Sequence, residues 1–239
     1  MSSVATAPVA VDYPDSDGKP VAESDFQLNE LIYAREGLRI YYRDRRRRDD
    51  VYVAGNLLIY YEEGNPRASV APDVFVVIGV ANHDRRSYRL WDEGGKAPDF
   101  VLEITSHSTR AEDQGHKREL YRRLGVKEYW QYDPTGDYLE PVLQGLASTA
   151  GEYRVIAGGE TAAGRPAVAS EVLGLELHVT EDGLRFHDPD TGQYLMSHAE
   201  AEAARAEAEA ARAEAEAARA EAEARIADLE ASLRNLGGS

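Results

Sequence analysis

The sequence predicts an α/β fold in which helices flank a central mixed β-sheet, followed by a long C-terminal helix. Segments 70–80 and 99–105 are short, almost continuously apolar runs, which is typical of strands buried on both faces. Apolar residues recur at helical spacing elsewhere, and segment 199–236 repeats Ala, Glu and Arg. We therefore expect a flexible leader at 1–23, one folded domain at 24–196 and a helical tail at 197–236.

Composition excludes several classes of protein. The 239 residues are 43% hydrophobic, which is enough to form a core, and they include no cysteine. Disulfides, thiolate zinc sites and a cysteine nucleophile are therefore excluded. The N-terminus lacks the basic and apolar regions of a signal peptide, and no apolar run approaches the ~18 residues of a membrane span. We expect a cytoplasmic protein that does not enter a membrane.

The net charge of −16 argues against a broad, non-specific affinity for nucleic acid. Contact with nucleic acid must then depend on a local basic surface or on a bound metal ion. The four arginines at 45–48 are flanked by Asp44, Asp49 and Asp50, which largely neutralise them. Four consecutive arginines suggest a phosphate-binding loop, but because of this neutralisation we favour a solvated turn.

The first half of the domain should contain one helix and several strands. Ser24 or Asp25 can cap a helix that ends near Asp44. Segment 50–62 is rich in Val, Ile and Tyr and predicts a strand or bent hairpin, with Gly55-Asn56 as a bulge or turn. Segment 88–91 predicts a further short strand.

The second half should return to the sheet after a helix. Thr109 and Glu112 form a capping box, and Gly125 ends the helix that begins there. Segment 127–132 predicts the next strand. Further short strands are expected at 138–146, 152–157, 172–179 and 183–188, as an antiparallel edge that extends or covers the sheet.

The tail repeats with a period of seven, which places arginine at 205, 212 and 219. Alanine favours the helix, and Glu and Arg three or four residues apart form ion pairs along it. Alanines at 3-4 spacing form a small-residue seam that Leu229 and Leu236 extend. This pattern fits a coiled coil that joins protomers into a homo-oligomer, and it fits a solitary charged helix equally well.

Two carboxylates stand in the apolar strands. Asp73 opens one strand after Pro72, and Glu103 lies within another. A buried carboxylate costs several kcal/mol unless a cation or hydrogen bonds compensate its charge. If the strands are neighbours, both carboxylates can converge on one point, and Mg²⁺ prefers such oxygen ligands. Asp73 and Glu103 therefore predict a Mg²⁺ or Mn²⁺ site for phosphodiester chemistry.

The pattern Asp73, Glu103-Ile104-Thr105 and Lys117 resembles the PD-(D/E)XK nuclease superfamily. More closely, the chain resembles the bacterial Uma-type restriction endonuclease family over roughly 24–179. The matching residues are Pro98 to Thr109, Asp113, Lys117, Tyr121, Gly125-Val126, Glu128-Tyr129-Trp130 and Asp133-Pro134. The resemblance implies a restriction-endonuclease-like core and metal-dependent cleavage of DNA.

One position departs from the superfamily pattern. The residue two after Glu103 should be lysine and is Thr105. The resemblance implies that Lys117, on the following helix, takes that role. Lys117 shares a helical face with Asp113, Leu120 and Leu124, so this face should lie against the sheet.

Other candidates have structural interpretations of comparable weight. Glu30 lies in the first helix, where related folds often place an extra acidic ligand. Asp99 begins a strand and is as well suited to structural hydrogen bonds as to metal binding. Asp113 could bind metal or stabilise the first turn of its helix. Tyr121 and Trp130 are interpreted as packing residues.

Three functions from two classes, enzyme and interaction module, fit the sequence. The first is a Mg²⁺- or Mn²⁺-dependent endodeoxyribonuclease in which Asp73 and Glu103 bind metal and Lys117 positions water or phosphate. The second is a catalytically inactive nuclease fold that serves as an interaction module through its tail. A nuclease acting on RNA or branched DNA is a third. The paired carboxylates and the inward lysine favour the first.

Overall fold

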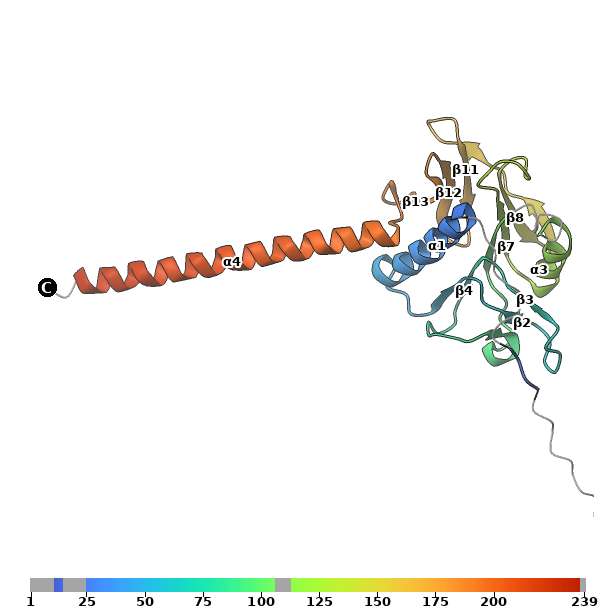
Figure 1. Ribbon diagram of the computed structural model, residues 1–239, viewed down its shortest axis with the longest axis horizontal. Helices are drawn as coiled ribbons and strands as arrows, with labels where there is room; N and C mark the ends of the chain where they lie inside the picture. Colours follow the sequence, from blue (N-terminus) through green and yellow to red (C-terminus); the bar gives the residue numbers. More distant parts are fainter. Residues whose placement is uncertain (1–10, 15–24, 106–112, 237–239) are drawn as a thin grey trace, which may run out of the picture. The chain divides into compact units, whose positions relative to one another are not determined.

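The computed structural model describes residues 11–14, 25–105 and 113–236 (Figure 1). The chain divides into two compact units, Met1–Leu195 and Met196–Ser239. Every strand among the described residues belongs to the first unit, and the second consists of helix α4 (His198–Leu236).

A central six-stranded sheet organises the first unit. Its strands, in spatial order, are β1 (Val51–Ala54), β4 (Val74–Ile78), β6 (Phe100–Ile104), β7 (Glu128–Tyr132), β8 (Leu143–Thr149) and β9 (Glu152–Val155). Strands β6 and β7 run parallel, and the other neighbours are antiparallel. The predicted mixed sheet is confirmed, with β4 and β6 as neighbours near its centre.

Two smaller sheets complete the unit. One is antiparallel and contains β10 (Gly159–Glu160), β11 (Pro166–Ser170), β12 (Leu175–Thr180), β13 (Gly183–Asp188) and β14 (Gln193–Tyr194). The other contains β3 (Ser69–Val70), β2 (Ile59–Tyr60) and β5 (Tyr88–Arg89). The sequence predicted that the later strands either extend or cover the central sheet. Strands β8 and β9 extend it, whereas β10–β14 form a separate sheet.

Helices lie on both faces of the central sheet (Figure 1). On one face lies α1 (Asp25–Ile40), which continues into a π-helical turn, η1 (Tyr41–Arg45). On the other lies α3 (Arg118–Leu124), preceded by the π-helical turn η3 (Asp113–Lys117) and ended by Gly125 with φ of 83°. A short 3₁₀ helix, η2 (Leu90–Glu93), follows β5. The predicted capping box at 109–112 lies outside the described residues.

Strand alternation separates two hydrophobic cores. Phe100, Leu102 and Ile104 of β6 pack into a core shared with α1 and the five-stranded sheet. Val101 packs into the core on the opposite face, which includes Tyr121 of α3. Because side chains alternate along a strand, Glu103 faces the same side as Val101. The sheet therefore directs Glu103 toward η3 and α3.

Local turns account for strand boundaries that the sequence did not locate. Strand β8 begins at Leu143 rather than 138, because the preceding residues fold around Asp133. Its carboxylate accepts hydrogen bonds from the backbone N–H groups of Thr135, Gly136, Tyr138 and Leu139. Segment 50–62 likewise divides into β1 and β2, which join different sheets.

Helix α4 matches the predicted tail helix. Arg212 pairs with Glu216 at 3.1 Å and Arg219 with Glu223 at 2.8 Å, each four residues apart. Exposed pairs of this kind contribute roughly 0.3–0.5 kcal/mol each, so they support the helix only modestly. Among the described helices, none combines the length and apolarity needed to cross a bilayer.

Candidate active site

Glu103 is the most deeply buried carboxylate of the site, with 0% of its surface exposed. Its Oε2 lies 2.9 Å from Nζ of Lys117, and its Oε1 accepts a hydrogen bond of 2.6 Å from the hydroxyl of Tyr121. The lysine and the phenol together compensate a charge that would otherwise be costly to bury.

Asp73 lies beside Glu103 at the start of β4. Val74 pairs with Leu102, and extending this antiparallel register by one residue sets Asp73 opposite Glu103. Directly opposed residues point to the same face, with Cβ atoms about 4.5–5.5 Å apart. Asp73 Oδ2 also accepts a 2.7 Å hydrogen bond from the backbone N–H of Ile104. The fold thus holds the two carboxylates on one face of the sheet.

A close backbone contact fixes the position of Asp73. The N–H of Asn56 lies 3.0 Å from the carbonyl oxygen of Pro72 and 3.3 Å from that of Asp73. A Cβ atom at Gly55 would lie 2.6 Å from the Asp73 carbonyl oxygen. A side chain at this position would force the backbones apart, so glycine lets the turn after β1 pack directly against Asp73.

Lys117 reaches the site from the end of η3. Its side chain is 13% exposed, and its ammonium group points to the sheet rather than to solvent. The π-helical turn precedes a regular helix, and such turns are frequent at functional sites. The helical stripe in the sequence predicted this inward direction.

Tyr121 does more than pack. It lies four residues after Lys117, so both side chains project from the same face of the helix toward Glu103. Burial, followed by the neighbouring Glu103 carboxylate, raises the pKa of Tyr121 well above its ordinary value. Tyr121 therefore keeps its proton and donates the hydrogen bond that orients Glu103. The sequence predicted only a packing role for this residue.

Two buried polar groups on this face have no hydrogen-bond partner among the described residues. They are Oγ1 of Thr105 and Nε2 of Gln131. Gln131 pairs with Glu103 in the parallel register of β6 and β7, and Thr105 lies two residues after Glu103. Buried polar atoms without partners are rare in native proteins and indicate a place for water or a ligand.

The structure separates Glu30 from the paired carboxylates. Glu30 lies on α1, on the opposite face of the sheet, and its Oε2 accepts a 3.0 Å hydrogen bond from the N–H of Leu184 in β13. Another α1 residue, Gln27, reaches the end of β6, where its Nε2 lies 3.4 Å from the carbonyl oxygen of Ile104. Gln27 was not predicted as a candidate, because a polar residue on a helix is too common to indicate a site.

Glu30 should instead make stability depend on pH. Burial raises its pKa from 4.5 to about 7. Below pH 4.5 both folded and unfolded chains hold the proton, and between pH 4.5 and 7 only the folded chain does. Stability therefore falls as pH rises through this window, by roughly 3 kcal/mol at 1.36 kcal/mol per pKa unit.

Glu30→Gln should abolish this contribution, because glutamine stays neutral and can still accept the hydrogen bond from Leu184. We expect the variant to melt at a higher temperature than the wild type at pH 8, and with less pH dependence between 4.5 and 7. Thermal denaturation followed by circular dichroism measures both, with the exposed Glu62→Gln as control. Identical pH profiles for wild type and Glu30→Gln would contradict the assignment.

Asp99 lies at the opposite end of β6 from Glu103, four residues or ~13 Å along the strand. Its carboxylate contacts Nζ of Lys127 at 2.7 Å, Nζ of Lys96 at 3.1 Å and the N–H of Ile78 at 2.7 Å. Burial alone would raise the pKa of Asp99, but these partners hold it below its ordinary value. Asp99 therefore has a structural role at a distance from Asp73.

The remaining candidate is Asp113. Its side chain lies outside the described part of the chain.

The donor set on this face fits a hard divalent cation. Asp73 and Glu103 supply carboxylate oxygens, which Mg²⁺ and Mn²⁺ prefer over nitrogen or sulfur ligands. The unpartnered hydroxyl of Thr105 and amide NH₂ of Gln131 lie on the same face, where they can hydrogen-bond water or phosphate oxygens rather than bind the ion. Asp73 and Glu103 are therefore the residues that would hold the metal.

Comparison with known proteins identifies the family. No curated protein matches the chain. One solved structure that it resembles is described as a putative nuclease belonging to DUF820 from Anabaena variabilis ATCC 29413, with 14% identity and a TM-score of 0.40 over 62% of this chain and 80% of that one. The Uma2 family model, described as "Putative restriction endonuclease", matches residues 17–180. The chain belongs to the Uma2 family.

Proposed function

We propose that the protein is a Mg²⁺- or Mn²⁺-dependent endonuclease that hydrolyses phosphodiester bonds in DNA. The observation that carries this proposal is the buried Glu103, paired with Lys117 at 2.9 Å and set opposite Asp73, in a chain of the Uma2 family. Membership of that family supports a nuclease. The metal and the substrate are our inference from the chemistry of the site.

Each residue of the site has a distinct task. A bound Mg²⁺ or Mn²⁺ supplies positive charge at the scissile phosphate and lowers the pKa of a bound water. Asp73 and Glu103 provide the oxygens that hold the cation. The ammonium of Lys117 offsets negative charge that builds on the phosphate in the transition state. Tyr121 fixes the orientation of Glu103, because its short hydrogen bond restrains one carboxylate oxygen.

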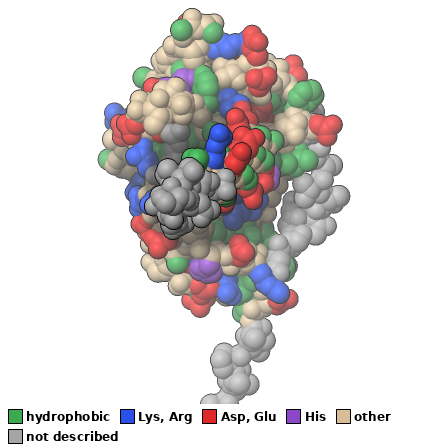
Figure 2. Space-filling model, turned by 90° about the vertical axis from the view of Figure 1, so that its left-hand side faces the viewer, with side chains coloured by type: hydrophobic (Ala, Val, Ile, Leu, Met, Phe, Trp, Pro, Cys, Tyr) green, Lys and Arg blue, Asp and Glu red, His purple; other side chains and the backbone are tan. Residues whose placement is uncertain are grey.

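The charge of the protein limits how DNA can bind. On the face drawn in Figure 2, acidic and basic side chains of the described residues lie interspersed. With a net charge of −16, long-range attraction of DNA is unfavourable. We infer that binding depends on the metal and on short-range contacts at the site, so affinity should be modest without the cation.

We also propose that α4 joins protomers into a homo-oligomer. Two large apolar side chains of the helix, Ile226 and Leu229, are 56% and 58% exposed, and they continue the region of the alanine seam. A dimer would bring two active sites to the two strands of a duplex. Sedimentation equilibrium of the full chain measures its oligomeric state.

The test uses supercoiled plasmid and a structured RNA, each incubated with Mg²⁺, Mn²⁺ or EDTA. We expect nicked or linear plasmid with either metal and none with EDTA. Cleavage of RNA alone would move the substrate from DNA to RNA. If neither nucleic acid is cut under any condition, the nuclease proposal fails and the interaction module becomes the better explanation.

A further inference from the structure

A second cluster of metal-binding side chains lies in the five-stranded sheet, remote in sequence from the proposed active site. It consists of Glu176 and His178 on β12 and His187 on β13. One oxygen of Glu176, Oε2, lies 3.0 Å from Nε2 of His178 and 2.9 Å from Nδ1 of His187. The ligand atoms of all three residues lie within 4.8 Å of one another.

The strand register creates this cluster. Glu176 pairs directly with His187, and His178 follows two residues after Glu176 on the same face. Leu177 and Phe186 alternate with them and point into the hydrophobic core. The two imidazole rings stack with an interplanar angle of 14° and centroids 4.8 Å apart, so a nitrogen of each ring can face the same carboxylate oxygen.

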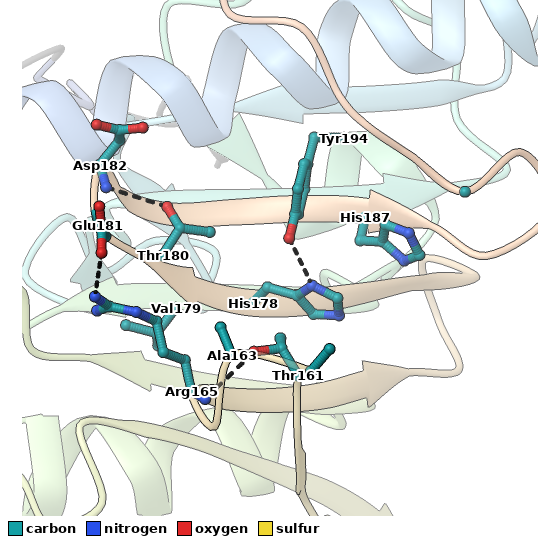
Figure 3. Close-up of a pocket in the computed structure, with 12 residues that line it drawn as sticks. Thr161, Ala163, Arg165, His178, Val179, Thr180, Glu181, Asp182, His187 and Tyr194 are labelled. Atoms are coloured by element: carbon teal, nitrogen blue, oxygen red, sulfur yellow. Dashed lines mark hydrogen bonds and ion pairs between the residues drawn. The ribbon is translucent and has the colours of Figure 1, made fainter.

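Tyr194 orients one of the histidines. Figure 3 shows the Tyr194 hydroxyl directed at His178, and its oxygen lies 3.2 Å from Nδ1. The 3.0 Å contact with Glu176 has Nε2–H as its donor; when a metal ion takes the place of that proton, Nδ1–H can donate to the Tyr194 hydroxyl and leave the Nε2 lone pair for the ion. Metal-binding histidines usually hold their second nitrogen in this way.

The position of His178 suits a ligand role. His178 is 8% exposed, and its Nε2 lies 3.0 Å from the Glu176 carboxylate. Both histidines and Tyr194 also line a pocket of about 640 Å³, through which an ion can reach the cluster.

One cation on the same sheet face as the cluster is engaged elsewhere. The guanidinium of Arg185, on the same face of β13, lies over the rings of Tyr33 and Tyr194 and donates a hydrogen bond to the carbonyl oxygen of Leu195. Its charge is therefore directed at aromatic faces and a carbonyl group. Glu176 remains the acidic partner of the two histidines.

We propose that Glu176, His178 and His187 bind one Zn²⁺ ion per chain, with a fourth coordination position open to the pocket. Zinc takes nitrogen and oxygen ligands at about 2.0–2.2 Å in a tetrahedral arrangement, which sets neighbouring ligand atoms roughly 3.3 Å apart. The observed separations of 2.9 and 3.0 Å lie near this value, and the ligand atoms, which all lie within 4.8 Å of one another, must approach by up to about 1.5 Å to admit the ion. A hydrogen-bonded group that only fastens β12 to β13 is the alternative.

The choice of metal follows from the ligands. Two imidazoles favour zinc and related transition metals over Mg²⁺, whereas the carboxylates of Asp73 and Glu103 favour Mg²⁺ or Mn²⁺. The two sites therefore differ in metal preference. This inference does not rest on the nuclease proposal, because zinc binding can be measured on protein that cuts nothing.

The experiment is calorimetric titration of Zn²⁺ into the full chain, prepared metal-free and without a polyhistidine tag. With excess Mg²⁺ present to occupy the Asp73 and Glu103 site, we expect one high-affinity zinc site in the wild type. His187→Gln should bind zinc at least tenfold more weakly, because even loss of an outer-shell partner costs tenfold or more. The matched control is His83→Gln, which changes an exposed histidine outside the cluster and should bind as the wild type does. Co²⁺ should give visible absorption bands in the wild type and lose them in His187→Gln.

A second variant protects the test against misfolding. Glu176→Gln removes the charged ligand but keeps the shape of the side chain, and it should weaken zinc binding while its circular dichroism spectrum stays that of the wild type. Absence of zinc binding in the wild type would overturn the proposal. So would equal affinity in the wild type, His187→Gln and Glu176→Gln, because the cluster would then be a hydrogen-bonded group alone.

Discussion

Glu103→Gln should reduce metal-dependent DNA cleavage by about a thousandfold or more. Glutamine preserves the shape of the side chain but removes the negative charge that holds the cation. A metal contributes several kcal/mol of transition-state stabilisation, and each 1.36 kcal/mol corresponds to tenfold in rate. The measurement is the initial rate of supercoiled plasmid nicking at saturating Mg²⁺, with both proteins prepared identically.

The matched control is Glu128→Gln. Glu128 is also buried, at 3% exposed, but it faces the opposite side of the sheet, where it accepts hydrogen bonds from Trp130, Ser170 and Val172. This variant should lose stability and yet cleave DNA at the wild-type rate below its melting temperature. If Glu103→Gln cuts as fast as Glu128→Gln, the activity does not depend on Glu103.

Lys117→Met should lower the cleavage rate by about a hundredfold or more, which is the usual cost of removing one group that stabilises transition-state charge. It should also destabilise the fold by about 3 kcal/mol, because Glu103 would keep its buried charge without its cation. Cleavage assays below the melting temperature separate the two effects. Lys117→Arg should restore stability better than activity, since guanidinium keeps the charge but differs in shape.

Lys127→Met is the control for this lysine. Lys127 also pairs with a buried carboxylate, that of Asp99 at 2.7 Å, and Asp99 keeps Lys96 as a second partner. Its loss should leave cleavage unchanged. Equal rates for Lys117→Met and the wild type would remove Lys117 from the chemistry and leave it as the structural counterion of Glu103.

Much of the fold could be predicted because local pattern and tertiary structure agree. Strands β4 and β6 are largely apolar runs buried on both faces, β7 is a buried strand rich in aromatic residues, and the tail helix follows from its alanine repeat. The five-stranded sheet was not anticipated as a separate sheet. Its strand β11, PAVAS, is short and begins with proline, so its pairing with β12 arises from tertiary contacts that no local pattern reveals.

The site divides in a similar way. Asp73 and Glu103 were apparent because charge in an apolar strand is exceptional. The sequence did not predict three residues that lie near the carboxylates or the end of β6, because such side chains are common in cores and on helix surfaces. They are Tyr121, Gln27 and Gln131. Their proximity to β6 depends on register and on helix position. Glu30 is the converse case. The resemblance to related folds suggested it as a ligand, but it lies on the other face of the sheet and accepts a hydrogen bond from Leu184.

The most direct test is the dependence of plasmid cleavage on Mn²⁺ concentration, measured for the wild type and for Asp73→Asn. If Asp73 and Glu103 share the cation, the wild type cuts only with metal. Asp73→Asn should then need at least tenfold more Mn²⁺ for half-maximal rate, and its maximal rate should also fall. Cleavage by the wild type in EDTA, or the same Mn²⁺ dependence in both proteins, would contradict a metal site shared by these two carboxylates.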